Sequence, residues 1–255
     1  MTAIRPWSPV LPGDATGWDL PDRLPHTLTP DEIRAINNPS NAIHEHRTYT
    51  WNGWDFDLPP GVFQPGETSR LVHSRLLDGT LPVAGLRYAA MGAGLGVEAV
   101  VAGMRGAAAV YALDVHPESV RTAARHYARI VGTDGPPLHP VVADVWEGFP
   151  DGAQVDVVTF NPPAIELPLS DDPDIVRNLC VGRGIAARFF DQLVGHDLLA
   201  PGGVVYLIVS NTAPLRDIVA LGLDAGFDAE VVHVEDWPGD DVQTYLFGLR
   251  RRSEQ

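Results

Sequence analysis

The sequence predicts an α/β protein built on a doubly wound, mainly parallel β-sheet. Apolar runs typical of buried strands alternate with helical stretches from residue 80 onward. Alternation of this length favours a parallel sheet covered by helices on both faces. A chain of 255 residues suffices for one large α/β domain with an N-terminal extension. We therefore expect an arm or lid over residues 1–60 and a main domain over residues 61–255.

Apolar runs supply the strands of a seven-stranded sheet, at residues 86–91, 110–115, 141–144, 155–160, 204–210, 229–235 and 243–250. Helices are expected at residues 97–104, 117–131, 185–199 and 215–225. No helical pattern separates the last two strands, so they are expected to form an antiparallel hairpin at one edge. The final strand should be inserted beside the strand at 204–210.

The N-terminal part of the chain has its own local signals. Residues 1–30 hold isolated tryptophans between prolines and glycines, which predicts an irregular arm rather than a regular helix. The motif Thr29-Pro30-Asp31-Glu32 combines an N-cap, a proline at the first helical position and acids in the first turn. It predicts a short helix at 30–37. Residues 49–58 alternate in polarity around Asn52-Gly53, the signal for a tight hairpin.

Composition restricts partners and location. The formal net charge is −15, from 18 basic and 33 acidic residues. A field of this sign repels phosphate backbones, so no nucleic-acid partner is expected. The chain has no long apolar run and residues 1–12 lack the apolar core of a signal peptide, so we expect a cytoplasmic location without membrane contact. The single cysteine, Cys180, excludes an internal disulfide, and the oligomeric state is left open.

A glycine loop follows the first expected strand. Gly92-Ala93-Gly94-Leu95-Gly96 joins the apolar run 86–91 to the helix 97–104. Glycine lets a ligand approach the backbone closely, and the helix N-terminus adds unpaired N–H groups. The spacing Gly-x-Gly-x-Gly is shorter than the Gly-x-Gly-x-x-Gly of dinucleotide-binding folds. Any tight strand-to-helix turn uses glycine, so the loop is informative only together with the motifs that follow it.

Two aspartates stand at the tips of the next two strands. Asp114 ends the run 110–115, where its carboxylate can accept both hydroxyls of a ribose. Capping of the next helix is the alternative, and we favour the ribose role. Asp144 ends the third strand, where it can accept an adenine amine with Val145 against the ring. A turn-forming aspartate explains Asp144 equally well.

The fourth strand ends abruptly in Asn161-Pro162-Pro163. Two prolines stiffen the backbone and remove two N–H donors. Free carbonyls and the Asn161 amide oxygen are then expected to face the cleft at the carboxyl ends of the strands. That arrangement suits an acceptor for a substrate N–H, which makes these three residues the catalytic candidates. The alternative is a rigid turn that only ends the strand.

These four motifs, in this order, resemble the class I S-adenosylmethionine (SAM)-dependent methyltransferases. More narrowly, they resemble the HemK-like branch, which methylates glutamine, guanine or adenine nitrogens. The resemblance covers residues 60–250 and implies a Rossmann-like fold with SAM as cofactor. The cofactor-binding residues that it implies are Gly92, Ala93, Gly94, Gly96, Asp114, Val115, Asp144, Val145 and Asn161. It also implies that Asn161-Pro162-Pro163 holds the target nitrogen.

The sequence departs from the family pattern at two positions. Members usually carry an acid two residues before the first loop glycine, where it helps to hold the ammonium of SAM, and this chain has Ala90. Members usually place Tyr or Phe after Asn-Pro-Pro to stack on a planar group, and this chain has Ala164. Both departures argue against the usual glutamine or nucleobase substrates.

Residues before the first strand are candidates for a lid or substrate wall. Aromatic side chains and a segment similar to the one that precedes the domain in the HemK-like branch give Tyr49, Trp51, Phe63, Glu67 and Thr68. An aromatic wall could favour a sulfonium through cation–π attraction, and ordinary packing of the arm is the alternative. His44-Glu45-His46 is similar to a metal-binding pair but has no third ligand, so no metal site is predicted.

Three functions compete. The first is a biosynthetic enzyme of secondary metabolism that transfers the SAM methyl group to a nitrogen of a small-molecule acceptor. The second is a cyclase that converts SAM to azetidine-2-carboxylate or 1-aminocyclopropane-1-carboxylate plus methylthioadenosine, which the Ala90 and Ala164 departures favour. The third is a SAM sensor without catalysis, against which Asn161-Pro162-Pro163 argues. The prevalence of methyl transfer in the family places the first hypothesis ahead.

Overall fold

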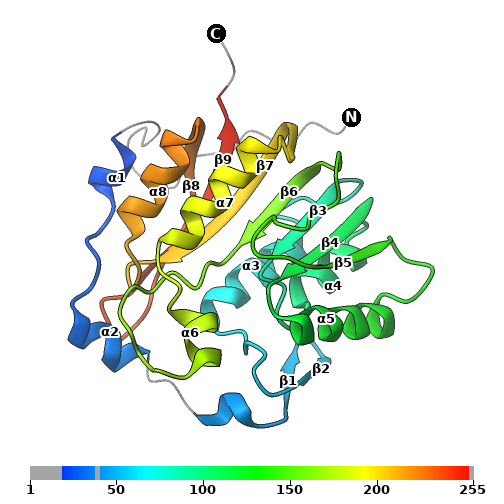
Figure 1. The fold of residues 1–255 in the computed structure, drawn as a ribbon, viewed down its shortest axis with the longest axis horizontal. Helices are drawn as coiled ribbons and strands as arrows, with labels where there is room; N and C mark the ends of the chain where they lie inside the picture. The colour runs from blue at the N-terminus through cyan, green and yellow to red at the C-terminus, as the bar shows by residue number, and fades with distance from the viewer. Residues whose placement is uncertain (1–18, 38–40, 253–255) are drawn as a thin grey trace.

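The computed structural model describes residues 19–37 and 41–252. Its centre is a seven-stranded sheet of order β5-β4-β3-β6-β7-β9-β8, and β1 and β2 form a separate two-stranded sheet (Figure 1). The strands of the large sheet are β3 (Arg87–Met91), β4 (Ala109–Asp114), β5 (Leu138–Val142), β6 (Val155–Phe160), β7 (Leu199–Ser210), β8 (Phe227–Asp236) and β9 (Gln243–Arg251).

Strand directions confirm the predicted topology. The strands from β5 to β7 pair in parallel, and β9 lies antiparallel between β7 and β8. The last two strands therefore form the expected edge hairpin, with the final strand inserted beside β7. Because β3, β4 and β6 are parallel, their carboxyl ends lie together at one end of the sheet.

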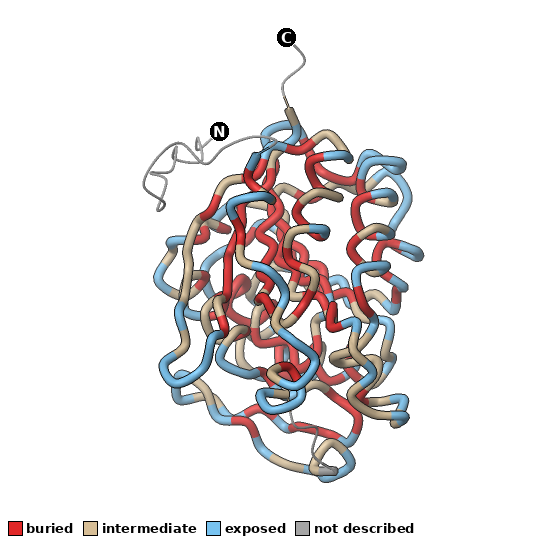
Figure 2. Tube along the Cα trace, turned by 90° about the vertical axis from the view of Figure 1, so that its left-hand side faces the viewer, coloured by how far each residue is buried: buried red, intermediate tan, exposed pale blue. Residues whose placement is uncertain are grey.

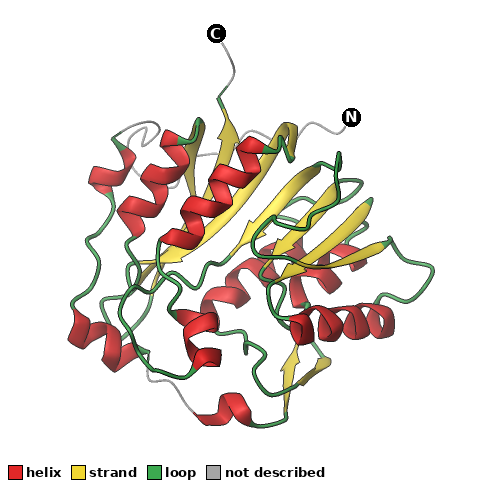
Figure 3. Ribbon diagram, viewed as in Figure 1, coloured by secondary structure: helices red, strands yellow, loops and turns green. Residues whose placement is uncertain are grey.

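Helices cover both faces of the sheet (Figure 3). They are α1 (Leu20–Arg23), α2 (Pro30–Ile36), α3 (Glu67–Asp78), α4 (Val97–Met104), α5 (Pro117–Ile130), α6 (Pro173–Leu179), α7 (Gly184–Gly195) and α8 (Leu215–Asp224), with a 3-10 helix η1 (Asn41–His44). One core cluster joins α7 and α8 to the sheet, and a second joins α3, α4 and α5 to its other face. Figure 2 shows the buried residues concentrated between these layers.

The N-terminal signals give the expected local structure. Thr29 and Glu32 form a reciprocal capping box at the start of α2, as the sequence predicts. The hairpin of β1 (Arg47–Trp51) and β2 (Trp54–Leu58) turns at Asn52-Gly53, where both residues have positive φ. Most of the predicted irregular arm, residues 1–18, lies outside the described residues, and α1 forms a single turn in the remainder.

Helices α1, α3, α6 and η1 were not predicted, and β5 and β7 begin earlier than the sequence predicts. β7 begins at Leu199 rather than at residue 204, because α7 already ends at Gly195. In α3 the buried stripe includes Ser69 and His73 beside Val72 and Leu76, so polar residues concealed the apolar periodicity. The helix α6 is short and was equally unexpected. β5 begins at Leu138 and contains Pro140, which interrupted the apolar run; an edge strand tolerates that proline.

The described residues contain no helix that is both long and apolar enough to cross a membrane. The cytoplasmic location and the division at residue 60 remain predictions.

Gly96 controls the approach of α4 to α5, and its replacement should destabilise the fold. An added Cβ would lie 2.6 Å from Ala123 Cα, and the residue has a φ of +79°. We expect Gly96→Ala to lower the free energy of unfolding by about 3 kcal/mol, since overpacking and left-handed strain add. Urea denaturation measures this loss.

Gly92→Ala is the matched control for Gly96→Ala. Gly92 has a φ of +72°, but an added Cβ would meet nothing within 4 Å. Backbone strain alone should cost about 1 kcal/mol at this position. Equal losses of unfolding free energy in the two variants would show that the clash with α5 contributes nothing to the destabilisation of Gly96→Ala.

Candidate functional site

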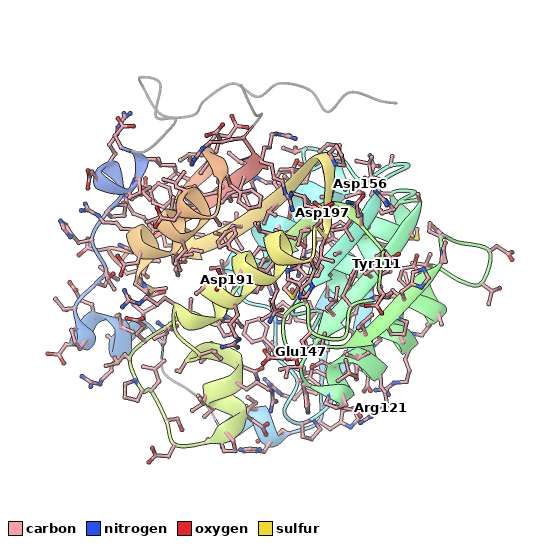
Figure 4. All side chains as sticks on the ribbon, turned by 45° about the horizontal axis from the view of Figure 1, so that its top comes forward. Tyr111, Arg121, Glu147, Asp156, Asp191 and Asp197 are labelled. Atoms are coloured by element: carbon pink, nitrogen blue, oxygen red, sulfur yellow. The ribbon has the colours of Figure 1, made fainter. Side chains whose placement is uncertain are left out.

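A pocket of about 590 Å³ opens where β3, β4 and β6 end. Its walls include Met91 and Gly92 after β3, Asp114 at the tip of β4, and Phe160 and Asn161 at the end of β6. Figure 4 shows Asp156 and Asp197, near the starts of β6 and β7, at the end of the sheet away from Glu147, which follows β5. The pocket therefore occupies the position at which open α/β sheets bind ligands.

The glycine loop forms one wall of the pocket. The Ala93 N–H donates to the Leu113 carbonyl at 2.8 Å, which holds the loop against β4. Gly92 and Gly94 line the pocket, whereas Ala93 lines a smaller side cavity and Gly96 lines neither. The open space at Gly92 gives a ligand access to the backbone. The loop thus has the close-approach geometry expected from its sequence at Gly92, whereas Gly96 packs against Ala123 of α5.

Asp114 links the loop to the next helix. Its Oδ2 accepts the Gly94 N–H at 2.9 Å and its Oδ1 accepts the His116 N–H at 2.8 Å. Burial raises the pKa of Asp114, while these two backbone donors oppose the shift. Each carboxylate oxygen has a second lone pair, so the side chain can still accept two hydroxyls from the pocket. His116 is the N-cap of α5 and no side chain caps that helix, so the capping role weighed for Asp114 from the sequence is not observed.

Asp144 and Val145 belong to the turn after β5 and line the pocket. Asp144 lies two residues beyond β5, and its Oδ1 accepts from Arg188 Nη2 at 3.2 Å. Val145 is buried and has a φ of +61°, which is strained for a β-branched residue. Both residues line the pocket together with Val115. Strain of this kind is tolerated mainly at functional sites, which supports a ligand role for the turn.

Asn161 presents an oriented amide to the pocket. Its Nδ2 donates to Ser69 Oγ at 3.2 Å, which directs the amide nitrogen toward α3. No hydrogen bond to its Oδ1 occurs among residues 19–37 and 41–252. Asn161 lines the pocket, so this oxygen is available as an acceptor.

The two prolines differ from the sequence expectation of free carbonyls. The Pro162 carbonyl accepts from the Ala164 N–H at 2.8 Å, and the Pro163 carbonyl accepts from Val181 at 2.8 Å and Gly182 at 3.2 Å. The loop after β6 is therefore closed on itself and on the segment after α6. The prolines line the pocket as rigid walls and leave the accepting role to the Asn161 side chain.

The candidate lid residues separate into two groups. Phe63 and Thr68 line the pocket. Tyr49 is buried beneath Arg70, and Trp51 packs on Trp54 and His73, so both lie in the hairpin packing outside the pocket wall. Glu67 is exposed and pairs with Arg70. Thus two of the five reach the pocket.

Several pocket residues escaped the sequence analysis. Ser69 comes from the unpredicted α3, and Arg177 comes from the unpredicted α6. Glu98 and His73 line the side cavity, which shares Phe63, Ser69, Met91, Gly92, Gly94 and Asn161 with the main pocket. The available signal was the single carboxylate of Glu98 within the otherwise apolar helix Val97–Met104.

His44 takes part in a cluster that the sequence did not predict. Its Nε2 lies 2.6 Å from Asp172 Oδ2, and its Nδ1 lies 3.8 Å from Asp174 Oδ2. These groups have ligand atoms within 4.8 Å of one another. Asp174 is also paired with Arg177 Nη1 at 2.7 Å, so the cluster joins η1 to α6 as an ion-pair network.

Comparisons with known proteins support the fold. The 16S rRNA N2 G1207 methyltransferase RsmC of T. thermophilus has a TM-score of 0.58 at 18% identity, covering 82% of this chain and 50% of that one. The M. jannaschii tRNA m1G37 methyltransferase has a TM-score of 0.57 at 14% identity, covering 82% and 57%. This chain thus spans half to somewhat more than half of their length.

A third similar structure is matched over almost its whole length. The E. cuniculi Mtq2–Trm112 complex, responsible for methylation of the eRF1 translation termination factor, gives a TM-score of 0.54 at 22% identity. The match covers 75% of this chain and 99% of that one. No family model matches the chain, and no curated protein does.

The expectation of a small-molecule acceptor in secondary metabolism, with no nucleic-acid partner, is wrong, and so is its cyclase alternative. The three similar structures described above are named for methylation of rRNA, of tRNA and of a translation termination factor. The sequence argument relied on net charge and on two missing side chains, Ala90 and Ala164. Net charge averages over the surface, and other residues can replace a missing side chain at a site.

The strand order, the position of the pocket and the structural neighbours all indicate the same fold. The inserted antiparallel β9 and the glycine loop after β3 are both present. The chain has the fold of the class I SAM-dependent methyltransferases.

Proposed function

We propose that this protein is an enzyme that binds SAM in the pocket at the ends of β3, β4 and β6 and methylates a nitrogen of a protein. The observation that carries the proposal is the convergence of the glycine loop, Asp114 and Asn161 on one pocket of about 590 Å³. A pocket of this size accommodates a ligand as large as SAM.

The residues present fit SAM. Open space at Gly92 receives its methionine part, and the carboxylate of Asp114 accepts the ribose hydroxyls. Asp144 accepts the adenine amine with its second oxygen, and Val145 packs against the ring. Bound SAM supplies an electrophilic methyl group on a positively charged sulfur.

The acceptor side is formed by Asn161 and its neighbours. Asn161 Oδ1 accepts a hydrogen bond from the N–H of the target nitrogen, because Ser69 holds the other end of the amide. Pro162 and Pro163 keep the loop rigid, and Phe160 and Phe63 add apolar wall. Fixing the nitrogen in this way contributes to catalysis by positioning. Phe63 can take part of the role of the aromatic residue that is absent at Ala164.

Similarity to a protein methyltransferase favours a protein as acceptor. The E. cuniculi complex, matched over 99% of that chain, is named for methylation of a protein, eRF1. The carboxamide of an asparagine or glutamine side chain offers the N–H that Asn161 Oδ1 requires.

A labelling experiment tests the proposal. Purified protein and SAM carrying a tritiated methyl group are added to cell extract, and the product is divided between ribonuclease and protease treatment. We expect protease-sensitive label, reduced at least about tenfold when Asn161→Ala replaces the wild type. Ribonuclease-sensitive label would show that the acceptor is RNA. SAM binding by calorimetry without any labelled macromolecule would refute methylation of a macromolecule.

A further inference from the structure

Glu98 is a partly buried carboxylate beside the proposed SAM pocket. It is the second residue of α4, and its side chain is 18% exposed. A side cavity of about 50 Å³ lies against it, beneath the glycine loop. The cavity and the main pocket share Gly92, Gly94 and Asn161, so a ligand at the loop can reach both.

Two hydroxyls hold one oxygen of this carboxylate. Tyr88 donates to Glu98 Oε2 at 3.1 Å, and Thr159 donates to the same oxygen. The two hydroxyls are themselves 2.5 Å apart. Among residues 19–37 and 41–252, Oε1 has no hydrogen bond, and His73 Nε2 lies 3.9 Å from it. One oxygen is therefore fixed and the other is available to the cavity.

His73 does not neutralise Glu98. Its side chain is buried, and its Nδ1 has no hydrogen-bond partner within the described part of the chain. Burial, with a contribution from the charge of Arg70, lowers the pKa of His73 to about 3, so the ring is uncharged at neutral pH. Arg70 itself pairs with Glu67 and Tyr49. A carboxylate without a cation is costly to bury, and burial raises the pKa of Glu98 accordingly.

The position of this carboxylate relative to β3 is informative. Ala90 is paired with Thr159 in the parallel register of β3 and β6. Thr159 is one of the two residues that hold Glu98. The Glu98 carboxylate thus reaches, from α4, the region beside Ala90 on the same face of the sheet.

We propose that Glu98 Oε1 binds the α-ammonium group of SAM in the side cavity, taking over from helix α4 a charge that β3 lacks at Ala90. An ammonium group fits an acceptor site of this size and supplies the missing cation. This inference rests on the SAM binding proposed above. His73 and Ser69 complete the cavity on the α3 side.

Comparison of three ligands separates the contributions of the nucleoside, the ammonium group and the charged sulfur of SAM to binding. Methylthioadenosine has the nucleoside and lacks the ammonium, while S-adenosylhomocysteine has the ammonium and lacks the charged sulfur. For Glu98→Gln we expect affinity for SAM and for S-adenosylhomocysteine to fall about tenfold to hundredfold, with methylthioadenosine unchanged. The amide oxygen can still accept from Tyr88 and Thr159, while its NH₂ presents donors to the ammonium. Isothermal calorimetry measures all three affinities.

Glu118→Gln is the matched control. Glu118 is also the second residue of its helix, α5, but it pairs with Arg121 and Arg125 at the surface. All three affinities should match those of the wild type in this control. Equal loss for all three ligands in Glu98→Gln would indicate a packing role and overturn the proposal, as would no loss. A loss confined to SAM would assign Glu98 to the sulfur instead. If wild-type protein binds neither SAM nor methylthioadenosine, the proposed function itself fails.

Discussion

Asp114→Asn should weaken SAM binding by about 2–3 kcal/mol, or roughly thirtyfold to more than a hundredfold. Both carboxylate oxygens accept backbone N–H groups, from Gly94 and His116. An asparagine would place its NH₂ against one of these donors and would lose one of the two acceptors for the ribose hydroxyls. The loss should be equally large for methylthioadenosine, because that ligand keeps the ribose. Calorimetry with both ligands measures it.

Asp156→Asn is the matched control for Asp114→Asn. Asp156 is also a strand carboxylate that accepts a backbone N–H, from Arg87 at 2.8 Å, and it pairs with the Arg87 guanidinium. It lies at the far end of the sheet (Figure 4). Its replacement should lower stability and leave ligand affinity unchanged. Unchanged affinity in Asp114→Asn would remove Asp114 from the binding site.

The raised pKa of Asp114 adds a pH dependence to this prediction. Burial is the main cause of the shift, so the carboxyl protonates at a higher pH than an ordinary aspartate. The ionised form is the better acceptor, so methylthioadenosine affinity should be full above this pKa and decline as the pH falls through it. Titration of wild type and Asp114→Asn should show the decline in the wild type only. A decline of equal size in the variant would assign the titration to another group.

The parallel sheet was predictable because its strands are buried on both faces and read as continuous apolar runs. β3 and β6 are examples, with Arg87–Met91 and Val155–Phe160 almost wholly buried. β5 failed this test because it lies at the edge, where Pro140 and two exposed residues break the run. The predicted strand at this edge therefore began three residues late, at 141 instead of 138.

The site was predictable where it is local in sequence. Gly92, Asp114 and Asn161 each follow a recognisable strand, and strand order alone brings them to one pocket. Ser69 and Glu98 were missed because their importance depends on contacts with residues far away in the chain. Ser69 meets Asn161 across 92 positions, and Glu98 meets Thr159 across 61. No local pattern encodes such contacts.

The two positions at which the chain departs from the family pattern, Ala90 and Ala164, show the same limit of prediction from sequence. From the sequence, Ala90 indicates a missing charge, and a missing charge suggested a different reaction. In the fold, Ala90 lies beside Thr159, and Thr159 holds the carboxylate of Glu98. The absence of a residue type at one position is therefore weak evidence about the chemistry, because a neighbouring element can supply the same group.

Asn161→Ala should lower the rate of methyl transfer about a hundredfold at saturating SAM while changing SAM affinity little. Removal of one preorganised hydrogen-bond partner at a reacting centre typically costs two to three orders of magnitude. No described residue donates a hydrogen bond to Asn161 Oδ1, and Ser69 fixes the amide that carries it. Ser69→Ala should cause a smaller loss, about tenfold, because the oxygen remains but is less well oriented.

The readout of these variants is the initial rate of tritium transfer into protein, with SAM affinity measured separately by calorimetry. A parallel fall in rate and SAM affinity would show that Asn161 holds the cofactor rather than the target nitrogen. A larger loss in Ser69→Ala than in Asn161→Ala would place the important contact on α3. We expect Asn161→Ala to be slower than Ser69→Ala, with SAM affinity unchanged in both variants. This order of rates follows only if the Asn161 amide oxygen accepts a hydrogen bond from the nitrogen that is methylated. That outcome would assign the end of β6 to the acceptor and the ends of β3 and β4 to SAM.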